Sequence, residues 1–136
     1  MNTIADSLQG LPPFAVYFAT CLVMLALSVA IYVRVTPYRE FDLIRQGNMA
    51  ASLSLSGALL GMVFPLSAAA SRSETIAELL LWSVIALTVQ LLAYLVARLL
   101  VPHVSEGIRQ GVAAHGLLLG SISVSVGLLN ASCMAY

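Results

Sequence analysis

Four long apolar stretches alternate with short polar segments along the chain, at about residues 14–33, 49–70, 79–100 and 112–131. Twenty residues of α-helix span about 30 Å, which is the thickness of the hydrocarbon core of a bilayer. The apolar residues run continuously, whereas the strands of a membrane barrel alternate apolar and polar positions over about ten residues. The pattern therefore predicts an all-α protein with four transmembrane helices.

The segments between the stretches carry an uneven distribution of arginine. Residues 34–47 and 101–111 would lie on one side of the membrane, and residues 71–78 on the other. The second side carries only Arg72. The first side, together with the helix ends that reach it, carries Arg34, Arg39, Arg45, Arg98 and Arg109. Because positively charged loops stay in the cytoplasm, we expect both termini to be periplasmic.

Composition agrees with a membrane location. Of the 136 residues, 60% are hydrophobic and 9% are charged, whereas a soluble domain carries charge at about 25% of positions. We expect the whole chain, 1–136, to form a single integral membrane domain. A basic segment before the first apolar stretch, which would indicate a cleavable signal peptide, is missing. The net charge of zero argues against nucleic acid as a partner.

The two halves of the chain resemble each other at an offset of 64 residues. Ile-Arg-Gln-Gly occurs at residues 44–47 and again at 108–111. At the same offset Arg34 corresponds to Arg98, and Asp42 corresponds to Glu106. Because each unit has an even number of spans, both copies would have the same orientation. We therefore expect a tandem parallel repeat of two-helix hairpins, at about 12–70 and 76–134, packed as a four-helix bundle.

Small residues recur at helical spacing on the second and fourth stretches. The second contains Gly57 and Gly61, and the fourth contains Gly116, Gly120 and Gly127. Such patterns let helix backbones approach closely in membranes. The two stripes are expected either to bind the helices of one chain together or to join the subunits of a homo-oligomer. The first and third stretches are bulkier, which favours outer positions facing lipid.

Four polar side chains in or beside the apolar stretches form a candidate intramembrane site: Asn48, Gln90, His115 and Asn130. Gln90 is near the middle of its stretch, where an amide needs a partner. It is expected either to join helices or to contact a substrate or proton path. Asn48 is suited to cap the start of the second helix. His115 is either a hydrogen-bonded interface residue or a pH sensor or proton relay.

Charged side chains gather in the two arginine-rich loops and at the helix ends beside them: Arg34, Glu40, Asp42, Arg45, Arg98, Glu106 and Arg109. The acidic residues are expected to be solvated counter-charges to the arginines, with a docking surface for a cytoplasmic protein as the alternative. The histidines and cysteines lack the spacing of a metal site, and no catalytic or phosphate-binding motif is present. We expect no metal, no cofactor and no enzymatic activity.

Several short strings, taken in order, carry a resemblance to a known family. They are Thr36-Pro37-Tyr38 with Glu40; Ile44-Arg45-x-Gly47-Asn48-x-Ala50-Ala51; Gly57-x-x-x-Gly61-x-x-x-Pro65-Leu66; Trp82; Gln90-Leu91; and Gly127-Leu128-Leu129-Asn130-Ala131-x-Cys133-Met134. Over about residues 13–134 the chain resembles the YjfL-like family of small bacterial inner-membrane proteins of unknown function. It departs from the family pattern at Arg39 and at residues 112–115. The resemblance implies a helical fold in the inner membrane and hints at envelope maintenance, without assigning a chemistry.

Together these features favour a small non-enzymatic membrane protein that serves envelope maintenance as a homo-oligomer or as a partner-binding component. Lipid would surround it, and a membrane or cytoplasmic protein is a further candidate partner. The alternative is a minimal transporter or channel subunit that uses polar residues inside the bundle. A third reading is a lipid- or quinone-binding component, with Arg34, Arg98 and Trp82 near a headgroup.

Overall fold

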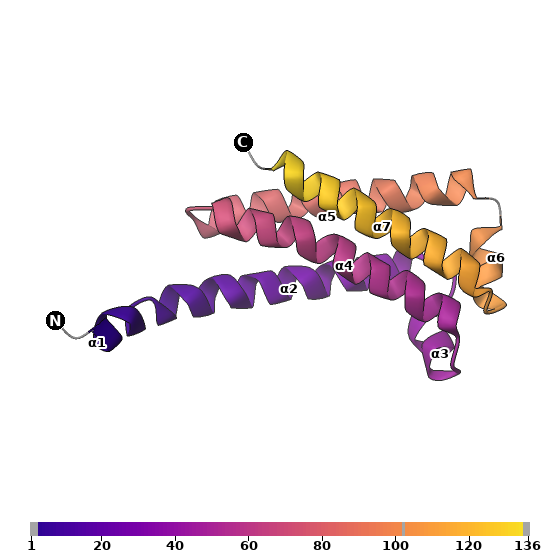
Figure 1. The fold of residues 1–136 in the computed structure, drawn as a ribbon, viewed down its shortest axis with the longest axis horizontal. Helices are drawn as coiled ribbons and strands as arrows, with labels where there is room; N and C mark the ends of the chain where they lie inside the picture. The colour runs from indigo at the N-terminus through magenta and orange to yellow at the C-terminus, as the bar shows by residue number, and fades with distance from the viewer. Residues whose placement is uncertain (1–2, 102, 135–136) are drawn as a thin grey trace.

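The computed structural model describes residues 3–101 and 103–134, and its ribbon is drawn in Figure 1. Within these ranges the regular structure is entirely helical. The elements in chain order are α1 (Thr3–Leu8), α2 (Leu11–Val35), α3 (Glu40–Arg45), α4 (Met49–Arg72), α5 (Ile76–Leu100), α6 (Val104–Arg109) and α7 (Ala113–Cys133). The segments Thr3–Val35, Met49–Arg72, Ile76–Leu100 and Ala113–Cys133 are long and apolar enough to cross a membrane. The prediction of four apolar helices is confirmed, and the bounds of α2, α4, α5 and α7 lie within a few residues of the predicted ones.

The central pair of helices is α4 and α7, which run side by side in Figure 1. They touch backbone to backbone, because glycines stand on both sides of the contact. A Cβ atom added at Gly57 would lie 2.6 Å from the carbonyl carbon of Gly120, and one added at Gly116 would lie 2.6 Å from the Cα of Ala50. Gly127 faces Gly61 in the same way. Both predicted small-residue stripes therefore face each other within one chain.

The other two spans, α2 and α5, pack around this pair, because their bulkier side chains prevent a backbone contact. Ten residues of α4 are buried, whereas α2 buries only Met24, Ser28 and Tyr32. The N-terminal half of α2, with α1 beyond it, diverges from the other spans (Figure 1). Phe14 and Phe18 on this half stack on each other at 5.6 Å between ring centroids, and both are exposed.

Two short helices, α3 and α6, occupy the connectors that the sequence pattern left without structure. Both begin and end at matching positions 64 residues apart, since α3 covers residues 40–45 and α6 covers 104–109. Each is followed by a glycine with positive φ, 84° at Gly47 and 78° at Gly111. That conformation is easy for glycine and strained for other residues. It turns the chain sharply into α4 and into α7.

The bundle has two different ends. One end carries α3, α6 and most of the arginines, and is called the arginine-rich end below; the start of α1 and the end of α7 lie at the opposite end (Figure 1). Buried aromatic and aliphatic residues fill the arginine-rich half, including Tyr32, Tyr38 and Tyr94. The opposite half is packed with apolar residues, including Met62, Leu66 and Leu79. Five of the six arginines are thus at one end, and Arg72 is at the other.

Candidate functional site

Asn48 joins the two hairpins at the arginine-rich end. It stands at the N-cap of α4, where its side-chain oxygen accepts a hydrogen bond from the backbone N–H of Ala51 at 3.0 Å. Its amide group donates to the carbonyl oxygen of Ile108 at 2.7 Å and to that of Arg109 at 3.4 Å. One side chain therefore satisfies an open donor at the start of α4 and adds a second bond to the carbonyl of Ile108 at the end of α6.

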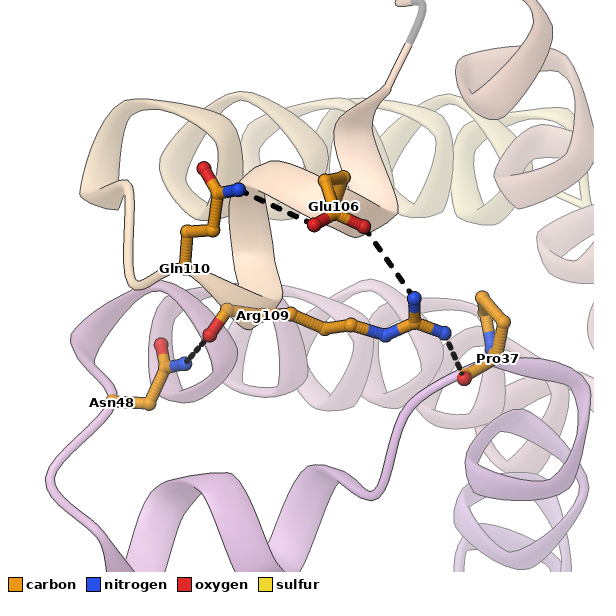
Figure 2. A network of polar contacts seen from close by, with 5 residues as sticks. All are labelled: Pro37, Asn48, Glu106, Arg109 and Gln110. Atoms are coloured by element: carbon orange, nitrogen blue, oxygen red, sulfur yellow. Dashed lines mark hydrogen bonds and ion pairs between the residues drawn. The ribbon is translucent and has the colours of Figure 1, made fainter.

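Arg109 makes the return contact from the second hairpin to the first, as Figure 2 shows. Its guanidinium donates to the carbonyl oxygen of Pro37 and lies 3.6 Å from the carboxylate of Glu106. Gln110 donates to the other oxygen of Glu106 at 3.2 Å, which steadies the carboxylate (Figure 2). These contacts hold the connector before α3 against α6.

Gln90 lies in the middle of α5 and bridges the central pair. Its amide donates to the carbonyl oxygen of Gly61 in α4 and, at 3.4 Å, to that of Ser123 in α7. Such a bond is available because a glycine exposes its carbonyl to a neighbouring helix. Gln90 therefore ties three helices together, and interhelical bonds of this kind contribute about 0.6 to 2 kcal/mol.

A small cavity lies beside Gln90, between α2, α4, α5 and α7. Its volume of about 30 Å³ is enough for roughly one water molecule. Its polar lining consists of Ser28, Tyr32, Gln90, Tyr94 and Ser123. The hydroxyls of Ser28 and Ser123 already donate to backbone carbonyls four residues earlier, at 2.7 and 3.1 Å. The cavity is thus a small, partly open hollow with few free polar groups.

His115 and Asn130 lie far apart on α7. The imidazole of His115 packs on Gly107 of α6, where a larger residue would overlap the ring, and its Nδ1 is buried without a hydrogen-bond partner. The side-chain nitrogen of Asn130 is likewise buried and unpaired, near the other end of the helix. Fifteen residues of helix separate them, which corresponds to about 22 Å.

The four polar residues selected from the sequence are therefore not gathered in one place. Asn48 and His115 lie at the arginine-rich end, Gln90 lies at the centre, and Asn130 lies toward the termini. Asn48 and Gln90 both act as bridges between helices. Among the described residues, no group of three or more His, Cys, Asp or Glu side chains is placed to hold a metal ion.

Glu40 corrects the expectation that the loop carboxylates are solvated counter-charges. Its exposure is 0%, and none of the ion pairs among the described residues includes it. The cause is the extended connector before α3, in which burial alternates. Thr36, Tyr38 and Glu40 point inward, whereas Pro37 and Arg39 point to solvent. An extended chain places every second side chain on the same face.

The remaining loop charges are exposed, as expected. Asp42 lies 3.7 Å from Arg39 and 3.8 Å from Arg45; the two arginines are largely solvated and Asp42 is half-exposed. Pairs of this kind contribute little to stability. Arg34 lies exposed near the end of α2. Arg98 instead lies over the ring of Tyr94, with its guanidinium carbon 5.9 Å from the ring centroid.

Three tyrosines from three segments surround Glu40: Tyr32 of α2, Tyr38 of the connector and Tyr94 of α5. The Tyr32 hydroxyl and the Ser54 hydroxyl of α4 lie 2.9 Å apart and share a hydrogen bond. The Tyr32 and Tyr94 rings pack edge to face at 5.4 Å. Both carboxyl oxygens of Glu40, and the hydroxyls of Tyr38 and Tyr94, are buried without a hydrogen bond of standard geometry.

Burial raises the pKa of the Glu40 carboxyl to about 7, although the nearby hydroxyls of Tyr38 and Tyr32 act in the opposite direction. Burial also raises the pKa of the Tyr38 hydroxyl, and the neighbouring Tyr32, Glu40 and Tyr94 raise it further. This cluster is not evident from the sequence, because Tyr32 and Tyr94 resemble ordinary interface aromatics. The sequence signal that was available is the spacing of Tyr38 and Glu40, two residues apart in an extended segment after a helix, which places both side chains on the same face.

Comparison with known proteins gives a consistent assignment. Residues 6–134 match a family described as a Domain of Unknown Function, DUF350. The UPF0719 inner membrane protein YjfL of Escherichia coli (strain K12) is 40% identical over 129 residues, which cover 95% of this chain and 98% of the relative. The UPF0719 transmembrane protein YshE of Bacillus subtilis (strain 168) is 26% identical over 116 residues, or 84% of this chain and 85% of the relative. No solved structure matches the chain.

Proposed function

The chain belongs to the DUF350 (UPF0719) family of inner-membrane proteins, and we propose that it is a non-enzymatic, homo-oligomeric component that serves envelope maintenance. The observation that carries the proposal is the divergence of α2 from the bundle. Its N-terminal half exposes large apolar side chains on two sides: Phe14, Phe18 and Leu22 form a row at four-residue spacing on one face, and Val16, Val23 and Leu27 lie on the opposite face.

The small-residue stripes do not serve as the contact between subunits in this proposal. Gly57 and Gly61 of α4 already face α7 within the chain, and Gly120 and Gly127 already face α4. That leaves α2 as the span with the least of its surface covered. A second copy would meet α2 with the same face, because a two-fold contact uses one patch twice.

Disulfide crosslinking in native membranes tests the contact. In a background where Cys21 and Cys133 are replaced by serine, Phe18→Cys or Leu22→Cys is oxidised and the products are separated by mass. We expect crosslinked dimers of two chains. The matched control is Leu129→Cys, which is exposed on α7 toward the same end of the bundle, and which should remain monomeric.

Two results would overturn the oligomer. One is equal crosslinking at Phe18 and Leu129, which would indicate random collision in the bilayer. The other is a single bleaching step for most fluorescently tagged molecules in lipid nanodiscs made from native membrane, which would indicate that lipid covers α2.

The envelope role is tested separately, by deleting the gene and measuring survival of osmotic and detergent stress. Rescue by the wild-type chain is expected, and survival that does not change on deletion would contradict the role.

The proposal also includes a tandem duplication with both arginine-rich loops in the cytoplasm. It is supported by the matching bounds of α3 and α6, by the equivalent glycines Gly47 and Gly111, and by the arginine bias. If each half is an autonomous hairpin, residues 1–74 and 75–136 expressed as two chains should assemble and co-purify. Failure of the halves to associate, although both insert, would contradict the duplication.

A minimal transporter is the second candidate, because the cavity beside Gln90 and the Glu40 cluster adjoin each other. Tyr32 lines the cavity and also contacts Glu40. The apolar packing of Met62, Leu66 and Leu79 in the opposite half opposes a continuous path. Flux through proteoliposomes that is abolished by Gln90→Leu would favour this candidate. Flux that is unchanged by Gln90→Leu and by His115→Ala would remove the version that uses these residues.

A further inference from the structure

The buried surroundings of the Glu40 carboxyl are poorly suited to a negatively charged carboxylate. It is fully buried in the first turn of α3, outside the membrane-spanning helices, and neither of its oxygens has a hydrogen bond of standard geometry or a cationic partner. An ionised carboxylate taken out of water without a partner is strongly destabilised. Something must neutralise it in the folded chain.

No arginine does so among the described residues. Arg39 and Arg45, on either side of Glu40 in the sequence, pair with Asp42, and Arg109 pairs with Glu106. Arg98 of α5 is directed at the Tyr94 ring. The groups that surround Glu40 are hydroxyls: those of Tyr32 of α2, Tyr38 of the connector and Tyr94 of α5, with Ser54 of α4 bonded to Tyr32. A neutral carboxylic acid fits this surrounding because it can donate to a hydroxyl oxygen and accept from another.

We propose that Glu40 is a proton-binding site whose occupancy holds the connector and α3 docked on the bundle at the arginine-rich end. With the proton bound, the carboxylic acid remains among the tyrosine hydroxyls. When the proton leaves for the adjoining solution, the charged carboxylate gains by moving into water and takes the first turn of α3 with it. The site thus links the pH on that side of the membrane to the position of the loop that carries Arg39, Asp42 and Arg45.

The dependence of docking on pH has a definite direction. Because burial raises the pKa of this carboxyl, the docked state is favoured at low pH and is lost as the pH rises through neutrality. Asp42, two residues away, is half-exposed and ion-paired, so it serves as a matched carboxyl that lacks the fully buried surrounding. The inference does not depend on oligomerisation through α2, since all contributing groups belong to one chain.

The experiment follows the proton and the loop separately on the full chain in lipid. Infrared difference spectra between pH 5 and pH 9 report the carboxylic acid band. We expect a midpoint near 7 in the wild type and in Asp42→Asn, and no such component in Glu40→Gln. Should Glu40→Gln fail to fold, Tyr38→Phe provides a second test, because loss of the hydroxyl that favours the charged form should raise the midpoint.

Loop position is read from a thiol reagent on Thr36→Cys, a buried connector position, in a cysteine-free background. Its rate is divided at each pH by that of the exposed Arg45→Cys, which removes the pH dependence of the thiol itself. We expect the ratio to rise several-fold across the midpoint, and to stay flat when Glu40→Gln is added.

Three outcomes would overturn the proposal. The first is a carboxyl midpoint at or below pH 5, and the second is a labelling ratio that does not change while the carboxyl titrates. The third is a midpoint that moves when sodium or potassium is exchanged for a bulky organic cation at constant ionic strength, since that would assign the site to a metal cation.

Discussion

A methyl group added to Gly57 tests the backbone contact between α4 and α7 most directly. In Gly57→Ala the new Cβ would lie 2.6 Å from the carbonyl carbon of Gly120, and closer still to its Cα. Carbon atoms in van der Waals contact are about 3.5 to 4.0 Å apart. The obstacle is backbone rather than a flexible side chain, so the two helices must separate by about 1 Å.

The expected cost follows from this geometry. Inserting a methylene into a tightly packed interior costs about 1–3 kcal/mol, and alanine recovers up to about 1 kcal/mol through its higher helix propensity. The separation also lengthens the neighbouring Gly61–Ser123 and Gly127–Gly61 contacts, which adds to the cost. We therefore expect Gly57→Ala to lower the free energy of unfolding by about 1–3 kcal/mol.

Unfolding in mixed micelles with increasing sodium dodecyl sulfate measures the change, with the single tryptophan, Trp82, as the fluorescent reporter. Gly10→Ala is the matched control, because a Cβ there meets only the Ser7 carbonyl oxygen, at 3.4 Å. It should leave the midpoint unchanged or slightly raised. If Gly57→Ala and Gly10→Ala unfold at the same detergent fraction, α4 and α7 are not in backbone contact in the membrane and the packing argument is refuted.

Asn48→Ala should destabilise the chain by about 1–3 kcal/mol, because both the cap on α4 and the bond to Ile108 are lost; a neutral result in the same unfolding assay would contradict the bridge between hairpins. Gln90→Leu should cost about 0.6 to 2 kcal/mol, and an equal or higher stability would indicate that its bonds to backbone carbonyls are not formed. Because the pKa of Glu40 is raised from its ordinary 4.5 to about 7, stability should be greatest below pH 4.5, fall by about 3 kcal/mol between pH 4.5 and 7, and level off above that; Glu40→Gln should remove that dependence, and its persistence would exclude Glu40 as the source. In whole cells, a membrane-impermeant thiol reagent should label Ser71→Cys and not Arg45→Cys, and the reverse pattern would invert the assigned topology.

The helical spans were the easiest part to predict, because each depends on a property of one continuous segment. An apolar run of 20 or more residues is recognisable wherever it packs, and α4 and α5 begin and end close to the expected residues. The short helices α3 and α6 were missed. Six residues carry too little hydrophobic periodicity to be recognised, and these helices depend on contacts with α4 and α7.

The candidate site was harder to predict, because its properties depend on contacts between distant segments. Gln90 was expected to need a partner, but only the packing decides that the partners are the carbonyls of Gly61 and Ser123. Glu40 shows the difference most clearly. Among arginines in the sequence it resembles a surface charge, whereas the extended connector turns it inward toward Tyr32 and Tyr94.

The sequence by itself therefore determined the number, length and composition of the spans, since a bilayer of fixed thickness selects apolar segments one at a time. It also determined which helices are able to approach closely, because only glycine and other small residues permit backbone contact. The tertiary structure alone decided that the stripes on α4 and α7 face each other and that Glu40 is buried. Those outcomes depend on the rotation of each helix about its axis and on the path of a connector, and neither is a property of any single segment.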